Sequence, residues 1–88
     1  PNPFNPSTTI RFSVPDVHQG AHVELAIYDL LGQKVRTLVA SPVETSGMEV
    51  AWDGRDDLVR EVSSGVYLYR LTTEGGKWTD TRKMVLIR

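Results

Sequence analysis

The sequence contains no cysteine, which excludes disulfide bonds, thiolate metal sites and a cysteine nucleophile. It has no excess of charge of either sign, because 10 Lys and Arg against 11 Asp and Glu leave a net charge of −1. Nucleic-acid-binding modules concentrate basic side chains to neutralise phosphates, so this balance argues against a nucleic-acid partner. No apolar run approaches the roughly 20 residues of a membrane-spanning helix, and we expect no membrane insertion.

Length and composition predict one small globular domain. The chain has 88 residues, of which 40% are hydrophobic and 24% charged. A domain of this size buries only about 60% of its unfolded surface, which leaves little room for a deep active-site cleft. The chain starts with Pro1 rather than Met, so we expect a piece of a longer protein, and the missing N-terminal export signal therefore says nothing about export. Residues 1–7 are expected to be an extended lead-in from an upstream linker, and residues 8–88 the domain itself.

Alternation of apolar and polar residues predicts β-strands. Residues 8–14 place Ile10, Phe12 and Val14 on one side of a strand and polar residues on the other. Further strands are expected at residues 22–28, 34–39, 48–52, 66–72 and 77–87. In residues 34–39, Leu38 breaks the alternation, which indicates a bulge or burial on both faces.

Turn residues separate these segments, and no helical period extends beyond a turn or two. Gly32 marks a tight connection, the Asp-rich residues 53–57 a turn-rich loop, and residues 74–77 (EGGK) a hairpin tip. Six or seven antiparallel strands of this kind predict an all-β sandwich, in which each strand buries one face.

Few residues are candidates for chemistry. His18, His22 and Glu24 are the only cluster that resembles metal ligands, but His22 and Glu24 are expected on a solvated face, so we predict no metal site. The three aspartates of the Asp-rich loop could bind calcium, although capping of their own turn is the expected role; they are Asp53, Asp56 and Asp57. No nucleophile, base and pocket occur together, so we predict neither an enzyme nor a cofactor.

Aromatic side chains raise the alternative of carbohydrate binding, because exposed rings can stack on sugars. Trp52 is in phase with Met48 and Val50, and the tyrosines at 67 and 69 are in phase with Leu71, so these three rings are expected in the core. Tyr28 and Trp78 are the candidates for exposed binding rings.

The C-terminal stretch, residues 77–88, is locally basic. It has four basic residues and one acid, a local charge of 4 − 1 = +3. Its apolar residues 84–87 stand between Lys83 and Arg88. On pattern alone this is a final strand whose flanking charges limit edge pairing.

The order and spacing of several short motifs resemble a known family. Residues 1–10 (PNPFNPSTTI) and 81–88 (TRKMVLIR) resemble the two ends of type IX secretion C-terminal sorting domains. Residues 28–35 (YDLLGQKV), 52–56 (WDGRD) and 64–71 (SGVYLYRL) resemble the immunoglobulin-like domain of the flagellar hook-capping protein. The resemblance spans essentially the whole chain.

This resemblance implies an immunoglobulin-like antiparallel β-sandwich of about seven strands at the C-terminus of a cargo protein. It implies transit of the cargo through the periplasm, recognition by outer-membrane secretion machinery, and release or attachment at the cell surface. Cleavage of the domain after export is also implied, and residues 65–67 (GVY) are expected to be structural. The sorting-signal candidates that it implies are Lys83, Met84, Val85, Leu86, Ile87 and Arg88.

The hypothesis from the sequence is a non-catalytic sorting signal whose last strand pairs with a partner's sheet edge. Two alternatives stay open: a structural or assembly module of the immunoglobulin-like kind, and a carbohydrate-binding module. Fold alone does not decide between them.

Overall fold

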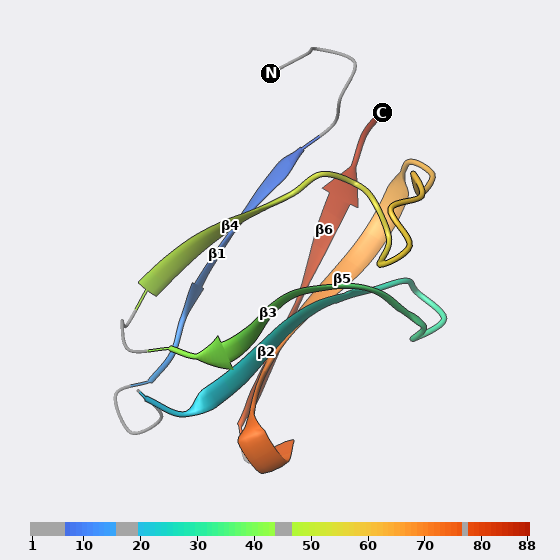
Figure 1. The fold of residues 1–88 in the computed structure, drawn as a ribbon. Coiled ribbons are helices and arrows are strands. Elements are labelled where there is room, and N and C mark those ends of the chain that lie inside the picture. Colours follow the sequence, from blue (N-terminus) through green and yellow to red (C-terminus); the bar gives the residue numbers. More distant parts are fainter. Residues whose placement is uncertain (1–6, 16–19, 44–46, 77) are drawn as a thin grey trace.

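The computed structural model describes residues 7–15, 20–43, 47–76 and 78–88, and these form a nearly pure β-structure (Figure 1). The elements, in chain order, are β1 (Thr8–Ser13), β2 (His22–Tyr28), β3 (Lys34–Pro42), β4 (Gly47–Trp52), β5 (Gly65–Thr73), the 3₁₀ turn η2 (Glu74–Gly76) and β6 (Thr79–Leu86). No helix long and apolar enough to cross a membrane occurs in the described ranges.

The strands form two antiparallel sheets that face each other (Figure 1). The smaller sheet contains β1 and β4, and the larger has the order β3-β2-β5-β6. The predicted all-β sandwich is therefore confirmed, with six strands in the described part rather than about seven. Between β4 and β5 the chain forms turns and one isolated bridge, Arg55 with Glu61, because Asp and Gly there favour turns over a further strand.

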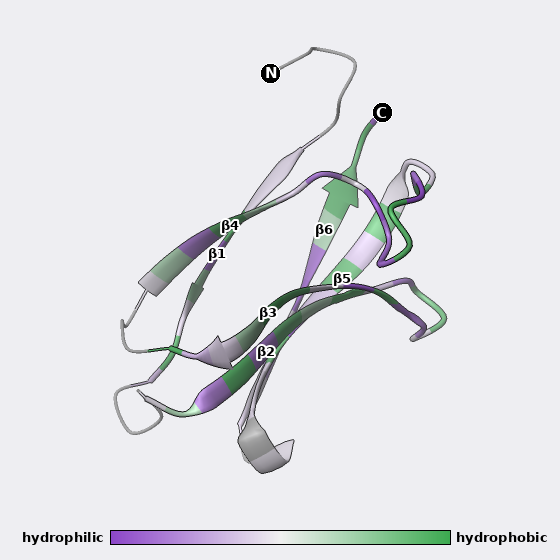
Figure 2. Ribbon diagram, viewed as in Figure 1, coloured by the Kyte–Doolittle hydropathy of each residue, from purple (hydrophilic) through white to green (hydrophobic). Residues whose placement is uncertain are grey.

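The core lies between the sheets, where the alternating apolar residues point. On β2, Val23, Leu25 and Ile27 are fully buried, as the alternation predicts. Trp52 at the end of β4 is also fully buried. Figure 2 shows the corresponding change between hydrophobic and hydrophilic residues along β2. The remaining buried apolar residues include Ile10, Phe12, Val14, Val43, Tyr67, Leu71 and Leu86.

The irregularity expected at Leu38 is present. Leu25 pairs with Val39 but the next residue, Ala26, pairs with Thr37, so Leu38 is left out of the register. A second shift omits Val35 in the same way. β3 also continues three residues beyond the expected end, to Pro42, which an edge strand tolerates because one row of its N–H groups needs no partner.

Candidate functional site

The C-terminal strand β6 is an edge strand. It pairs with β5 over its whole length, from Thr79 opposite Thr72 to Leu86 opposite Gly65, and no other described strand pairs with it. The backbone groups of its other edge therefore lack a ladder partner among the described strands. Such an edge is a template for pairing with another chain.

The two faces of β6 differ in exposure, and the predicted signal residues are divided between them. Leu86 is 1% exposed and packs into the core, with Met84 half-buried beside it. Lys83 is exposed on the other face, as is Val85 at 56%. Ile87, just beyond the strand, is 77% exposed. One face of β6 therefore packs against the core near its end, and the other face is exposed to solvent.

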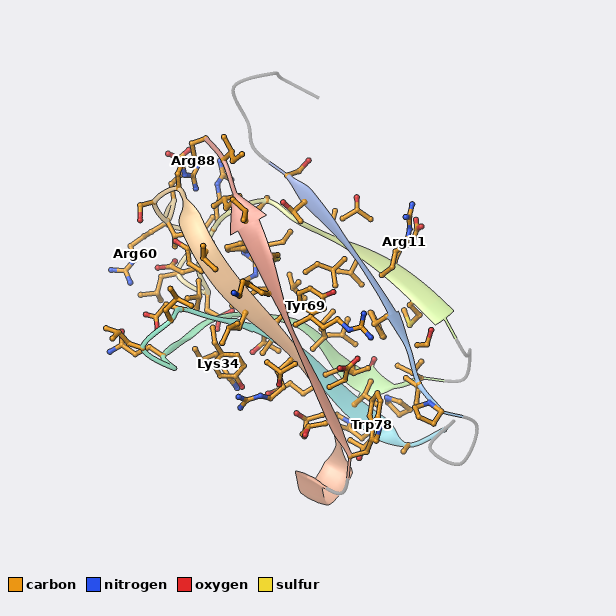
Figure 3. All side chains as sticks on the ribbon, turned by 180° about the vertical axis from the view of Figure 1, so that it is seen from behind. Arg11, Lys34, Arg60, Tyr69, Trp78 and Arg88 are labelled. Carbon is orange, nitrogen blue, oxygen red and sulfur yellow. The ribbon has the colours of Figure 1, made fainter. Side chains whose placement is uncertain are left out.

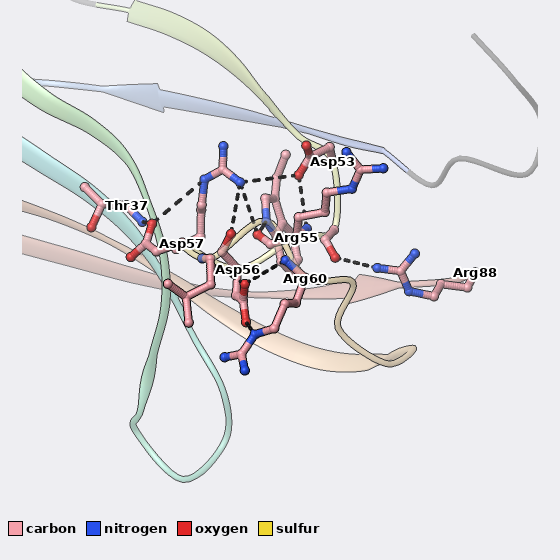
Figure 4. Close-up of polar contacts among 11 residues, drawn as sticks. Thr37, Asp53, Arg55, Asp56, Asp57, Arg60 and Arg88 are labelled. Carbon is pink, nitrogen blue, oxygen red and sulfur yellow. Dashed lines mark hydrogen bonds and ion pairs between the residues drawn. The ribbon is translucent and has the colours of Figure 1, made fainter.

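The side chain of Arg88 is held by the loop between β4 and β5 and is not free at the end of the chain. Its guanidinium donates hydrogen bonds to the carbonyl oxygens of Gly54 and Val62, and its backbone N–H donates to Ser64 Oγ at 2.8 Å. An ion pair with Glu61 spans 3.8 Å. We call these four residues the Arg88 socket. Figure 4 shows Arg88 reaching toward this loop.

Gly54 makes the close approach of Arg88 possible. Its φ of +75° lies in the left-handed region, which glycine adopts without strain. A Cβ at this position would stand 3.0 Å from Arg88 Nη2 and 3.2 Å from Leu86 Cδ2. A side chain here would therefore crowd the ends of the Arg88 and Leu86 side chains, which would have to shift by a few tenths of an ångström, and it would strain the backbone.

Two buried aromatic residues, Trp52 and Tyr67, hold the loop that carries the socket. Trp52 and Tyr67 meet edge to face, with ring centroids 5.2 Å apart. Trp52 Nε1 donates to the carbonyl of Arg55 at 2.9 Å, and the Tyr67 hydroxyl donates to the carbonyl of Ser63 at 2.6 Å. Both bonds fix the loop that carries the socket, so the structural role expected for residues 65–67 is supported by this geometry.

Two of the three aspartates of this loop cap their own turns, and the third bonds to a neighbouring strand (Figure 4). Asp53 Oδ1 accepts the N–H of Arg55 at 3.0 Å, and Asp56 Oδ1 accepts the N–H groups of Leu58 and Arg60 at 3.0 and 2.9 Å. Asp57 Oδ1 accepts an N–H from β3. The expected capping role is therefore confirmed for Asp53 and Asp56, whereas Asp57 links the loop to β3.

Hydrogen bonding lowers the pKa of the Asp56 carboxyl below its usual value. The main cause is the backbone N–H of Arg60, partly opposed by desolvation, with further help from the Arg60 side chain and the N–H of Leu58. The charged form of Asp56 is thus the form that the turn stabilises.

No group of three or more potential ligands is placed to hold a metal ion within the described ranges. His22 is exposed, and Glu24 forms a 3.1 Å ion pair with Lys34 across the outer face of the sheet. His18, the third member of the predicted cluster, lies outside the described residues.

The two candidate binding rings are half-buried rather than exposed, and they lie in different hollows. Tyr28 is covered by Arg70, whose Cζ is 4.9 Å from the ring centroid, in a hollow on the outer face of the larger sheet. Trp78 packs against the core and lines a groove of about 620 Å³ between the sheets, together with Tyr69 (Figure 3). The rings therefore form no common platform for one sugar chain, and sugar binding by either stays a prediction.

The sequence reasoning missed the Arg88 socket. Its members are 24 to 34 positions from Arg88 along the chain, and none belongs to a motif that names an arginine partner. The only signal in the sequence was Gly54, which was assigned to a turn.

A comparison with family models matches residues 1–87 to the secretion system C-terminal sorting domain. No curated protein and no solved structure matched the chain in the corresponding comparisons, so the immunoglobulin-like kinship stays a prediction. Domains of the matched family are non-catalytic signals that the secretion machinery recognises, and they mark proteins for export to the cell surface or beyond. The chain therefore belongs to the C-terminal sorting domains, the signals of type IX secretion.

Proposed function

We propose that the type IX machinery recognises this domain by adding a strand to the free edge of β6. The observation that carries this proposal is the position of β6, which pairs on one side with β5 alone among the described strands. Main-chain hydrogen bonds along such an edge supply affinity, and alternate side chains supply specificity.

The side chains available for specificity are those on the exposed face of the strand and just beyond it. Lys83 and Val85 alternate with the half-buried Met84 and the buried Leu86, and Ile87 follows them. Together they offer one cation and two branched aliphatic groups at regular spacing. Arg88 acts as a positioning residue, because its bonds to the socket hold the end of the strand in one place.

The context of the signal is part of the same proposal. Residues 1–7 connect the domain to upstream cargo, although residues 1–6 lie outside the described part of the chain. The cargo passes through the periplasm, and the recognising partners are outer-membrane proteins of the machinery. The domain itself carries out no catalysis, binds no nucleic acid and does not insert into a membrane.

Export of a reporter enzyme fused to this chain tests the proposal in a bacterium with type IX secretion. Val85→Asp combined with Ile87→Asp removes the exposed aliphatic groups without touching buried residues, and it should retain the reporter in the periplasm. Deleting residues 83–88 should do the same in a domain that still folds, a condition to be checked because the deletion also removes the buried Leu86. Thr79→Asp is the matched control, since Thr79 is exposed on the same strand outside the tail. Normal export of a folded double variant would contradict the proposal.

A further inference from the structure

Two five-residue turns at one end of the domain share a single hydrogen-bond pattern. In residues 29–33, Asp29 Oδ1 accepts the N–H groups of the third and fifth residues, both at 2.9 Å. In residues 56–60, Asp56 Oδ1 does the same at 3.0 and 2.9 Å. In each turn the first N–H bonds to the fifth carbonyl and the fourth N–H to the first carbonyl, at 2.9 to 3.1 Å. The two turns are thus copies of one rigid scaffold.

The copies differ at the fourth position, where both have a positive φ. Gly32 has φ +84° and Val59 has φ +64°. Glycine adopts this region without cost, whereas a β-branched residue there is a genuine outlier. The Val59 side chain is 65% exposed, so core packing does not compensate for the strain. A strained exposed side chain points to a role for the side chain itself.

Both turns present aliphatic groups to solvent. Leu31 and Leu58 occupy the same third position and are 86% and 70% exposed, while Leu30 is 64% exposed. Since two turns carry these residues, we call the four side chains together the tip pair; they are Leu30, Leu31, Leu58 and Val59.

The two turns are held side by side. The Asp57 N–H donates to the carbonyl of Val35 at 2.9 Å, and the Thr37 N–H donates to Asp57 Oδ1 at 3.0 Å. A hollow of about 290 Å³ lies between the turns, and charged side chains make up most of its lining, with Gln33 and Leu58 among the others. Figure 1 shows both turns at the end of the sandwich where β6 finishes.

The local charge decides which partner suits the tip pair. Residues 29–37 and 55–61 contain four basic and four acidic side chains, so their net charge is 4 − 4 = 0. A neutral surface gains no electrostatic attraction to anionic lipid headgroups. Exposed aliphatic anchors on a preformed scaffold suit an apolar cleft in a protein, because little conformational freedom is lost on binding.

We propose that the tip pair is a second docking surface, which inserts into an apolar cleft of a protein of the secretion machinery. This inference rests on the proposed sorting function and adds a contact separate from the β6 edge. Through the two contacts, the machinery would recognise both the terminal strand β6 and the end of the sandwich where this strand finishes.

Val59→Gly gives the sharpest test in the reporter fusion. Glycine keeps the turn geometry and removes the strain, so the thermal midpoint of the domain should be equal or higher. Export should fall about tenfold, the effect of losing one central anchor. A stabilised or unchanged domain with lower export is a result that a merely structural role would not produce, and unchanged export would overturn the proposal for Val59.

The double variant Leu31→Asn and Leu58→Asn tests the leucines, with Leu31→Met and Leu58→Met as the control that retains apolar groups. The asparagine variant should fold normally and lose export about tenfold or more, whereas the methionine variant should be exported. Equal export of both folded variants would overturn the proposal.

Two further readouts separate the possible failures. If the unaltered fusion is not exported, the proposed sorting function is wrong. If the β6 variants lose export but the tip-pair variants do not, only the proposal for the tip pair is wrong. Flotation with vesicles of lipopolysaccharide and phospholipid should leave the isolated chain unbound. Vesicle binding that disappears in the asparagine variant would assign the tip pair to lipid and overturn the protein partner.

Discussion

At both ends of β6, every second side chain points between the two sheets, but the surroundings of these side chains differ between the ends. At the C-terminal end, Leu86 is buried and Arg88 occupies its socket. At the beginning, the in-phase positions are Asp80 and Arg82, which line the open groove between the sheets and pair with each other at 3.2 Å. Inward charges on an edge strand oppose uncontrolled pairing. The comparison indicates a strand that is anchored where the signal lies and open where it starts.

The largest expected effect separates the two ends directly. Leu86→Ala should lower the free energy of unfolding by about 2–5 kcal/mol, because it leaves a cavity in the core. Arg82→Ala should cost less than about 1 kcal/mol, since its ion pair is solvent-exposed. Urea unfolding followed by Trp fluorescence measures both, and similar losses would break the distinction.

Next in size is the close approach at Gly54, for which Gly32 is a matched control. Both glycines have positive φ, but a Cβ at Gly32 would meet nothing within 4 Å. Gly32→Ala should cost about 1–2 kcal/mol from backbone conformation alone. Gly54→Ala should cost about 1 kcal/mol more, because the methyl group crowds Arg88 and Leu86 and both side chains must shift slightly. Equal losses in urea unfolding would show that the socket accommodates the methyl group freely.

The socket bonds themselves should have a smaller effect. Arg88→Lys keeps the charge but loses the planar fork that reaches two carbonyls, which should cost about 1–2 kcal/mol. Amide hydrogen exchange should accelerate at the end of β6 more than at its beginning. Uniform acceleration along the strand would mean that Arg88 does not anchor that end in particular.

The smallest expected effect is on pH dependence, through Asp56 in the loop beside the socket. Its pKa in the folded state is lowered from the ordinary 3.8, so the contribution of its charged form to stability is complete above about pH 4. That contribution disappears as pH falls through the lowered folded-state pKa. Asp56→Asn keeps an acceptor oxygen and removes the titration, so acid unfolding curves of the variant should be flatter below pH 4. Superimposable curves would exclude Asp56 as a source of acid sensitivity.

The strands were predictable because a half-buried strand places every second residue in the core. Val23, Leu25 and Ile27 followed that rule, and the break at Leu38 marked a real shift of register. The prediction that the Tyr28 ring is exposed was wrong, because the ring is covered by Arg70, a residue 42 positions away in the sequence. Alternation assigns a side chain to a face of a sheet and carries no information about its neighbours on that face.

The sequence by itself determined the all-β class, the segments that became strands, the capped aspartate turns and the membership of the sorting-domain family. These are local properties, because strand alternation and turn capping depend on residues a few positions apart. Only the tertiary structure decided that β6 lies at an edge, that Arg88 is held by Gly54 and Val62, and that the turns at 29–33 and 56–60 are side by side. Each of these depends on how distant segments pack, and the period of two that predicts a strand is the same for every place in a sheet.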